Sequence, residues 1–125
     1  MSLKILLLIG TGSFIGGVFR YLVSFPLMHK YPHGFPWGTL MVNVLGCLLI
    51  GILYAYADRW YFPKEWRLFL ATGLLGGFTT FSAFSNETIT LSQNGQTTMA
   101  ILYILTSVLL GLTATFLGVF LIRMV

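Results

Sequence analysis

Residues 76–88 read GGFTTFSAFSNET, and this polar stretch interrupts a segment that is otherwise apolar. It lies between LFLATGLL (68–75) and ITL (89–91). Adjacent glycines and adjacent threonines form helices poorly, because glycine loses much backbone entropy and hydroxyl groups compete for backbone partners. We therefore expect a helix that is broken near its middle at this stretch.

The composition of the chain indicates a membrane protein. Of its 125 residues, 57% are hydrophobic and only 8% are charged, against roughly 25% charged residues in ordinary globular proteins. So few charged side chains cannot cover the surface of a soluble domain. The composition predicts an integral membrane protein embedded in the lipid bilayer, and with the apolar spans described next we expect an all-α, multi-pass protein of the cell (inner or plasma) membrane.

Hydropathy divides the chain into four segments of the length that crosses a bilayer, which is about 20 residues. We expect spans at residues 3–25, 37–57, 64–92 and 98–122, within a single four-helix transmembrane domain over residues 1–125. Pro26 is expected to end the first span, and Gly95 suits the C-terminal cap of the third. Almost no chain remains outside the bilayer, and no nucleophile–base or metal-ligand set is present, so we do not expect an enzyme.

The net charge of +4 comes from scattered basic residues at the ends of apolar runs. That placement is typical of headgroup contacts, and no nucleic-acid partner is expected. Both termini and the loop after the second span lie on one side of the membrane. The positive-inside rule favours a cytoplasmic location for that side, which carries Lys4, Arg59, Lys64, Arg67 and Arg123.

A helix break in mid-membrane frees backbone groups that must be buried in protein or line a cavity. Freed carbonyls suit a hard monovalent cation, and freed N–H groups at the start of the next half-helix suit an anion. Phe81 and Phe84 follow the break at i, i+3 spacing and share a face. Their positive ring edges can contact an anion, although this spacing also fits ordinary packing.

Other polar residues within the spans leave alternatives open. Arg20 either snorkels to the headgroups or lines a vestibule that attracts anions. Asn43 either makes an interhelical hydrogen bond or donates in a polar pathway. Tyr103 and Ser107 share a face of the fourth helix. Glu87 is either a residue of a pathway mouth or an acid at a helix end.

GGFTTFSAFSNE (76–87) resembles the G-G-x-[ST]-T-F-S-T-F-S-x-E signature of the Fluc/CrcB family of fluoride channels. GTGSFIGGVFRYLVS (10–24) is similar to the first helix of that family with its arginine, and PWGTLMVNVLGCLLIG (36–51) to its second helix. The resemblance covers nearly the whole chain. Ala83 departs from it, standing where the family usually has threonine, and so does Gly111, where some members carry serine.

The resemblance implies a dual-topology homodimer, in which two four-helix subunits pack antiparallel around a structural sodium ion and form two fluoride pathways. It implies that the backbone carbonyls of Gly76 and Thr79 hold the sodium and that Arg20 supplies the vestibule charge. The pathway residues that it implies are Asn43, Phe81, Phe84, Ser85, Tyr103 and Ser107.

The implied function is a fluoride-selective channel that exports cytoplasmic fluoride passively, down its electrochemical gradient, and so confers fluoride resistance. The alternative is a small four-helix drug/proton antiporter, which needs a membrane-embedded carboxylate. The first helix has Arg20 and no acid, and Glu87 lies toward the end of the third span. An accessory membrane subunit is a third interpretation. It explains the G-x-x-x-G spacing of Gly12 with Gly16 and of Gly73 with Gly77 as helix packing, but not the clustered polar groups.

Overall fold

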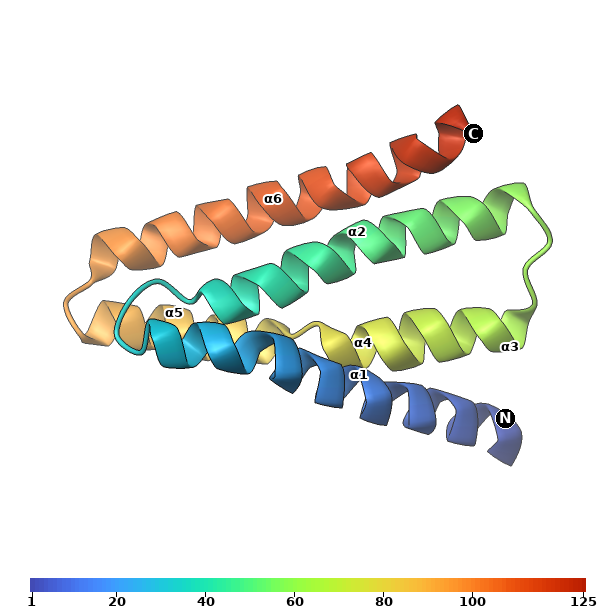
Figure 1. Cartoon of the computed structure of the whole chain (residues 1–125), viewed down its shortest axis with the longest axis horizontal. Helices are drawn as coiled ribbons and strands as arrows, with labels where there is room; N and C mark the ends of the chain where they lie inside the picture. The colour runs from blue at the N-terminus through green and yellow to red at the C-terminus, as the bar shows by residue number, and fades with distance from the viewer.

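The computed structural model describes all residues, 1–125, and every regular element is a helix (Figure 1). Four stretches are long and apolar enough to cross a membrane: Leu3–Lys30, Trp37–Arg59, Lys64–Gln93 and Thr97–Met124. The prediction of four apolar helices is confirmed. The elements in chain order are α1 (Leu3–Lys30), α2 (Trp37–Arg59), α3 (Lys64–Arg67), the π-helix η1 (Leu68–Leu75), α4 (Gly76–Phe78), α5 (Phe81–Gln93) and α6 (Thr97–Met124).

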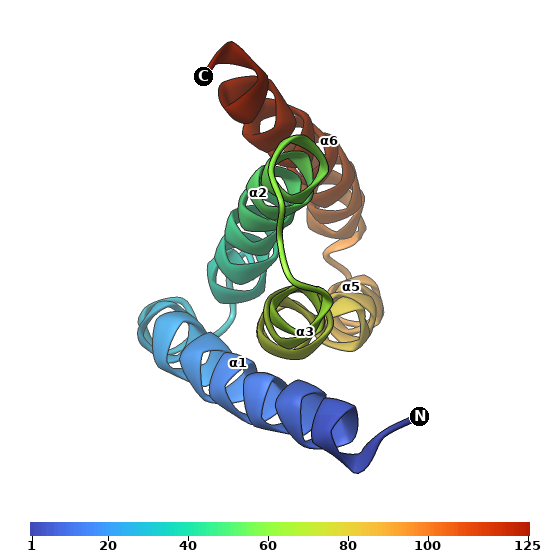
Figure 2. The same ribbon diagram turned by 90° about the vertical axis from the view of Figure 1, so that its right-hand side faces the viewer.

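The third span is a composite of α3, η1, α4 and α5. Together with α2 it lies between α1 and α6, which occupy opposite sides of the molecule (Figure 2). α2 packs mainly against α6, and α1 packs mainly against η1 and α4. Both termini lie at the same end of the molecule as the connection from α2 to α3 (Figure 1).

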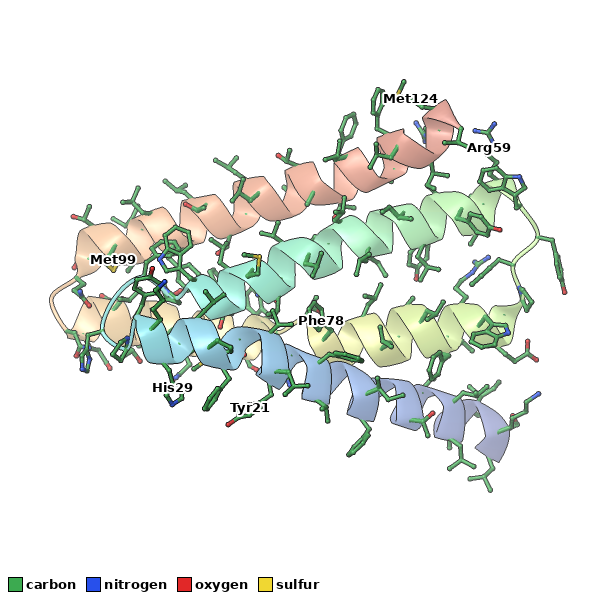
Figure 3. All side chains as sticks on the ribbon, viewed as in Figure 1. Tyr21, His29, Arg59, Phe78, Met99 and Met124 are labelled. Atoms are coloured by element: carbon green, nitrogen blue, oxygen red, sulfur yellow. The ribbon has the colours of Figure 1, made fainter.

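The outer faces of the bundle expose many large apolar side chains, and Figure 3 shows side chains projecting outward from α1 and α6. Phe14 on α1 is 74% exposed and Phe116 on α6 is 72% exposed. The buried core is correspondingly small, with one cluster formed by Leu40, Leu91, Ala100 and Tyr103. Large apolar side chains at this exposure are unfavourable in water, whereas lipid tails or a further protein surface cover them without cost.

The first helix is longer than its sequence predicts. Pro26 does not end it, because α1 continues to Lys30 with Pro26 inside and exposed. Proline removes one backbone donor, and membrane helices tolerate this loss when neighbouring groups satisfy the backbone. The carbonyl that loses its helical partner is that of Leu22, four residues before the proline, whereas the Ser24 hydroxyl donates to the carbonyl of Arg20 at 2.7 Å. The expected end at residue 25 is therefore wrong.

The third span breaks at Thr79 and Thr80, midway between Lys64 and Gln93. Thr79 has φ −84° and ψ 159°, and Thr80 has φ −152° and ψ 120°, so both residues are extended. Gly76, by contrast, is helical, with φ −63° and ψ −38°. Of the poor helix formers in this stretch, the threonines and not the glycines leave the helix.

Close packing explains why glycines precede the break. A Cβ atom on Gly16 of α1 would overlap the carbonyl oxygen of Leu74, and one on Gly77 would overlap that of Ser13. The backbones of α1 and of the third span therefore touch directly, as small-xxx-small patterns allow in membranes. The π-helical turns of η1 lie in this contact, and no sequence pattern predicted them.

Candidate functional site: a polar groove at the helix break

One side chain of the neighbouring helix α2 holds the extended segment through hydrogen bonds to Thr80. Asn43 of α2 accepts a hydrogen bond from the backbone N–H of Thr80 through Oδ1 at 2.8 Å. It also donates from Nδ2 to the carbonyl oxygen of Thr80 at 2.9 Å. The structure contains the interhelical hydrogen bond, which is one of the two roles predicted for Asn43. At the break, the amide takes the place of helical backbone partners for both the N–H and the carbonyl of Thr80.

Thr80 also begins the helix that follows the break. Its hydroxyl oxygen accepts a hydrogen bond from the backbone N–H of Ala83 at 3.1 Å, which is an N-cap interaction. The same hydroxyl lies 3.2 Å from the hydroxyl of Ser82. The N-terminus of α5, where the helix dipole has its positive end, therefore lies directly at the break.

A groove of about 390 Å³ lies beside the break. It brings together six of the residues singled out from the sequence. These are Asn43, Gly76, Thr79, Phe81, Phe84 and Ser107.

The groove contains one hydroxyl group that has no partner. Oγ of Ser107 is buried and makes no hydrogen bond, although nearly every buried polar group in a protein is paired. The rings of Phe81 and Phe84 are 5.4 Å apart, and Phe81 is 78% exposed. An aromatic pair and a free donor thus share one groove that is open on the side of Phe81.

Glu87 forms a hydrogen-bonded cluster with two other helices. Thr39 of α2 donates to Oε1 of Glu87 at 2.6 Å, and the hydroxyl of Tyr103 of α6 donates to Oε2 at 2.6 Å. Glu87 is therefore not merely a helix-end acid. Thr39 was missed in the sequence, where the available signal was its i, i+4 spacing from Asn43 on the same helix.

The cluster lies between the groove and a second cavity of about 320 Å³. The ring of Tyr103 is 5.1 Å from that of Phe84, which lines the groove. Glu87 lines the second cavity together with His33 and Trp37, near the connection from α1 to α2. Phe84, Tyr103 and Glu87 therefore link the two cavities within one chain.

Two of the residues singled out from the sequence lie apart from the groove. Arg20 is half-buried on α1, and Ser85 is exposed on α5; neither lines the groove. Tyr103 is fully buried and reaches the groove only through its contact with Phe84.

Comparison with known proteins gives a consistent relationship over most of the chain. The family model described as "CrcB-like protein, Camphor Resistance (CrcB)" matches residues 7–119. A protein of Phocaeicola vulgatus named fluoride-specific ion channel FluC is 44% identical over 117 residues, which cover 94% of this chain and 97% of that protein.

Two further proteins with the same name are similar to the same extent. The protein of Leptospira interrogans is 44% identical over 121 residues, covering 96% of this chain and 95% of its own length. That of Rhizobium meliloti is 46% identical over 119 residues, covering 94% of this chain and 95% of its own length. The family match and these identities over nearly full length leave one conclusion: the chain belongs to the CrcB family.

Proposed function

We propose that this protein is a fluoride-selective channel that lets cytoplasmic fluoride leave the cell passively, down its electrochemical gradient, and so confers fluoride resistance. The observation that carries the proposal is the unpartnered hydroxyl of Ser107 beside Phe81 and Phe84 in the groove. The names of the relatives support the same function. The drug/proton antiporter gains no support from them.

The groove has the chemistry that a small anion needs. Fluoride is strongly hydrated, so a path through the membrane must offer donors in place of water, and conduction requires that each site also release the ion. Ser107 supplies a hydroxyl donor, and the rings of Phe81 and Phe84 supply weakly positive edges. The N-terminus of α5 adds the positive end of a helix dipole. None of these groups carries a full charge, which favours rapid release.

The second cavity extends this route. Fluoride would pass from the groove along the rings of Phe84 and Tyr103, and leave through the cavity that Glu87 lines. To donate to the ion, the Tyr103 hydroxyl would have to turn away from Glu87, to which it donates here. In this proposal Asn43 holds the break and presents its amide to the groove, Ser85 continues the polar track and Arg20 supplies positive charge in the vestibule.

A second copy of the chain completes the site in this proposal. Phe81 is 78% exposed and the groove is open beside it, so one subunit alone does not enclose an ion. Two subunits packed antiparallel would close both grooves and would place both helix breaks in mid-membrane. The exposed apolar faces of the bundle supply the surface that such a dimer needs.

Sodium fits the carbonyl groups at the break. In an unbroken helix the N–H of Thr80 would bond to the carbonyl of Gly76, but here it bonds to Asn43. The Gly76 carbonyl is thus released from its helical partner, and carbonyl oxygens are the ligands that a hard cation prefers. The carbonyls of Gly76 and Thr79 from two subunits would hold a structural sodium ion at the dimer interface.

Ion efflux from liposomes that contain the purified protein tests the proposed function. We expect rapid fluoride efflux, little chloride efflux, and a loss of fluoride efflux in Phe81→Ile. The matched control is Phe14→Ile, since Phe14 is equally exposed but lies on α1, away from the groove. This control should conduct like the wild type.

Three results would contradict, in turn, the selectivity, the Phe81 pathway and the channel function. Equal efflux of fluoride and chloride would show that the groove does not select fluoride. An equal loss in both variants would show that Phe81 has no special role. Uptake of a lipophilic cation driven by a proton gradient, without fluoride efflux, would favour the antiporter.

A further inference from the structure

An arginine of α2 caps the C-terminus of α6. Nη1 of Arg59 donates hydrogen bonds to the carbonyl oxygens of Ile122 and Arg123, each at 3.2 Å. Figure 3 shows Arg59 beside the end of α6, close to Met124. These carbonyls belong to the last turn, where a helix leaves acceptors unpaired and has the negative end of its dipole. The guanidinium is therefore held in a defined position.

An aromatic cluster also contacts this guanidinium. Arg59 lies over the ring of Trp60, 4.9 Å from its centre. Trp60 in turn packs on Tyr56, with ring centres 4.9 Å apart, and Tyr56 meets Phe62 edge to face at 5.9 Å. Tryptophan and tyrosine at the end of a membrane helix lie at the depth of the lipid headgroups. Arg59 is thus held at headgroup depth.

Arg59 keeps hydrogen-bonding capacity in this position. A guanidinium has five N–H donors in a planar fork that matches phosphate oxygens. Both hydrogen bonds to α6 come from a single nitrogen, Nη1, and Arg59 is exposed. Its other N–H groups can therefore bind an acceptor that approaches from the membrane surface.

The charge around Arg59 favours an anion as that acceptor. The end of the molecule that holds the termini carries five basic residues against two acidic ones, Asp58 and Glu65. At the opposite end, Lys30 is the one lysine or arginine, and it lies over the ring of Tyr31 at 5.6 Å. The five basic residues are Lys4, Arg59, Lys64, Arg67 and Arg123.

We infer that Arg59, supported by Trp60, binds the phosphate group of an anionic phospholipid. The lipid headgroup is the source of phosphate that fits, because the guanidinium lies where two apolar spans end and the acyl chains can follow the exposed faces of α2 and α6. Tyr61, which is 92% exposed beside Trp60, extends the same surface. This site is independent of the ion that the protein conducts.

Native mass spectrometry of the detergent-purified protein tests the site, with dioleoylphosphatidylglycerol and dioleoylphosphatidylcholine as probes. We expect phosphatidylglycerol to bind more tightly than phosphatidylcholine, and Arg59→Gln to weaken it about fivefold, since a basic residue near an anionic surface contributes about that much. Lys30→Gln is the matched control, because it also removes a cation stacked on the following aromatic ring. It should leave phosphatidylglycerol binding unchanged.

A variant that leaves the helix cap intact separates binding from folding. Arg59→Gln also removes a cap from α6, so its melting temperature is measured as well. Lys64→Gln removes a charge from the same end but no hydrogen bond to α6, and should weaken phosphatidylglycerol binding without loss of stability. Equal binding of the two lipids, or equal effects of Arg59→Gln and Lys30→Gln, would overturn the site. Displacement of the lipid by soluble glycerol 3-phosphate would show that it takes free phosphate instead.

Discussion

At the scale of single residues, the break in the third span depends on the amide of Asn43. An extended segment between two membrane helices leaves backbone groups unpaired, and each unpaired group costs free energy when no water is present. Asn43 satisfies both the N–H and the carbonyl of Thr80. Its side chain is therefore a structural element of the break, whatever further role it has toward an anion.

Replacing Asn43 tests this role. Asn43→Ala leaves both groups of Thr80 unpaired, so we expect the free energy of unfolding to fall by about 1 to 3 kcal/mol and fluoride efflux to be lost. Thermal unfolding in detergent and liposome efflux measure the two effects. Thr106→Ala is the control, because the Thr106 hydroxyl bonds only to Leu102 of its own helix. If Asn43→Ala and this control have the same free energy of unfolding, the amide does not stabilise the break.

At the scale of elements, the contact of α1 with η1 and α4 positions the groove. Glycines bring these backbones together, and the π-helical turns of η1 lead directly into α4 and the break. π-helical segments are frequent at functional sites. The sequence contained the glycine spacing but no sign of the π-helix, because its hydrogen-bonding pattern arises from the packing of the two spans and not from local propensity.

Two glycines of α1 give a matched pair of variants. A Cβ on Gly16 would overlap the backbone at Leu74, whereas a Cβ on Gly10 meets nothing within 4 Å. We expect Gly16→Ala to lower the free energy of unfolding by about 1 to 3 kcal/mol, as overpacking does. Gly10→Ala should leave it unchanged or raise it slightly, since alanine favours the helix. Thermal melting curves of both variants decide this, and equal melting temperatures would contradict the contact.

At the scale of the whole molecule, one subunit leaves a groove open and large apolar faces exposed. The proposed antiparallel dimer closes the groove, and it requires that the chain insert in both orientations. The charge distribution opposes this to some degree, because the basic end favours the cytoplasm. Orientation is therefore the property of the whole molecule that most needs measurement.

Labelling of introduced cysteines from one side of the membrane measures the orientation of the chain. Tyr61 and Asn94 are exposed in connections at opposite ends of the molecule, and Cys47 is the only native cysteine. In a Cys47→Ala background, Tyr61→Cys and Asn94→Cys are each treated in whole cells with a membrane-impermeant maleimide. A two-fold antiparallel dimer exposes about half of the copies of each cysteine. Complete labelling of one and none of the other would contradict dual topology.

The sequence by itself determined the class and the family of this protein. Hydropathy, helix-breaking residues and the motif at 76–87 are local, so four apolar helices and a break near residue 79 could be predicted, and the family match confirms the resemblance. The end of α1 could not, because whether a proline ends a membrane helix depends on the surroundings of that helix and not on the proline alone.

Only the tertiary structure decided which polar groups satisfy one another. Asn43 pairs with Thr80 across 37 positions, and Glu87 with Thr39 across 48. It also left the hydroxyl of Ser107 without a partner. Such pairings depend on how the helices rotate and cross, which no local pattern contains, because a polar residue in a span has the same sequence signature whether it is paired, exposed or free to meet an ion.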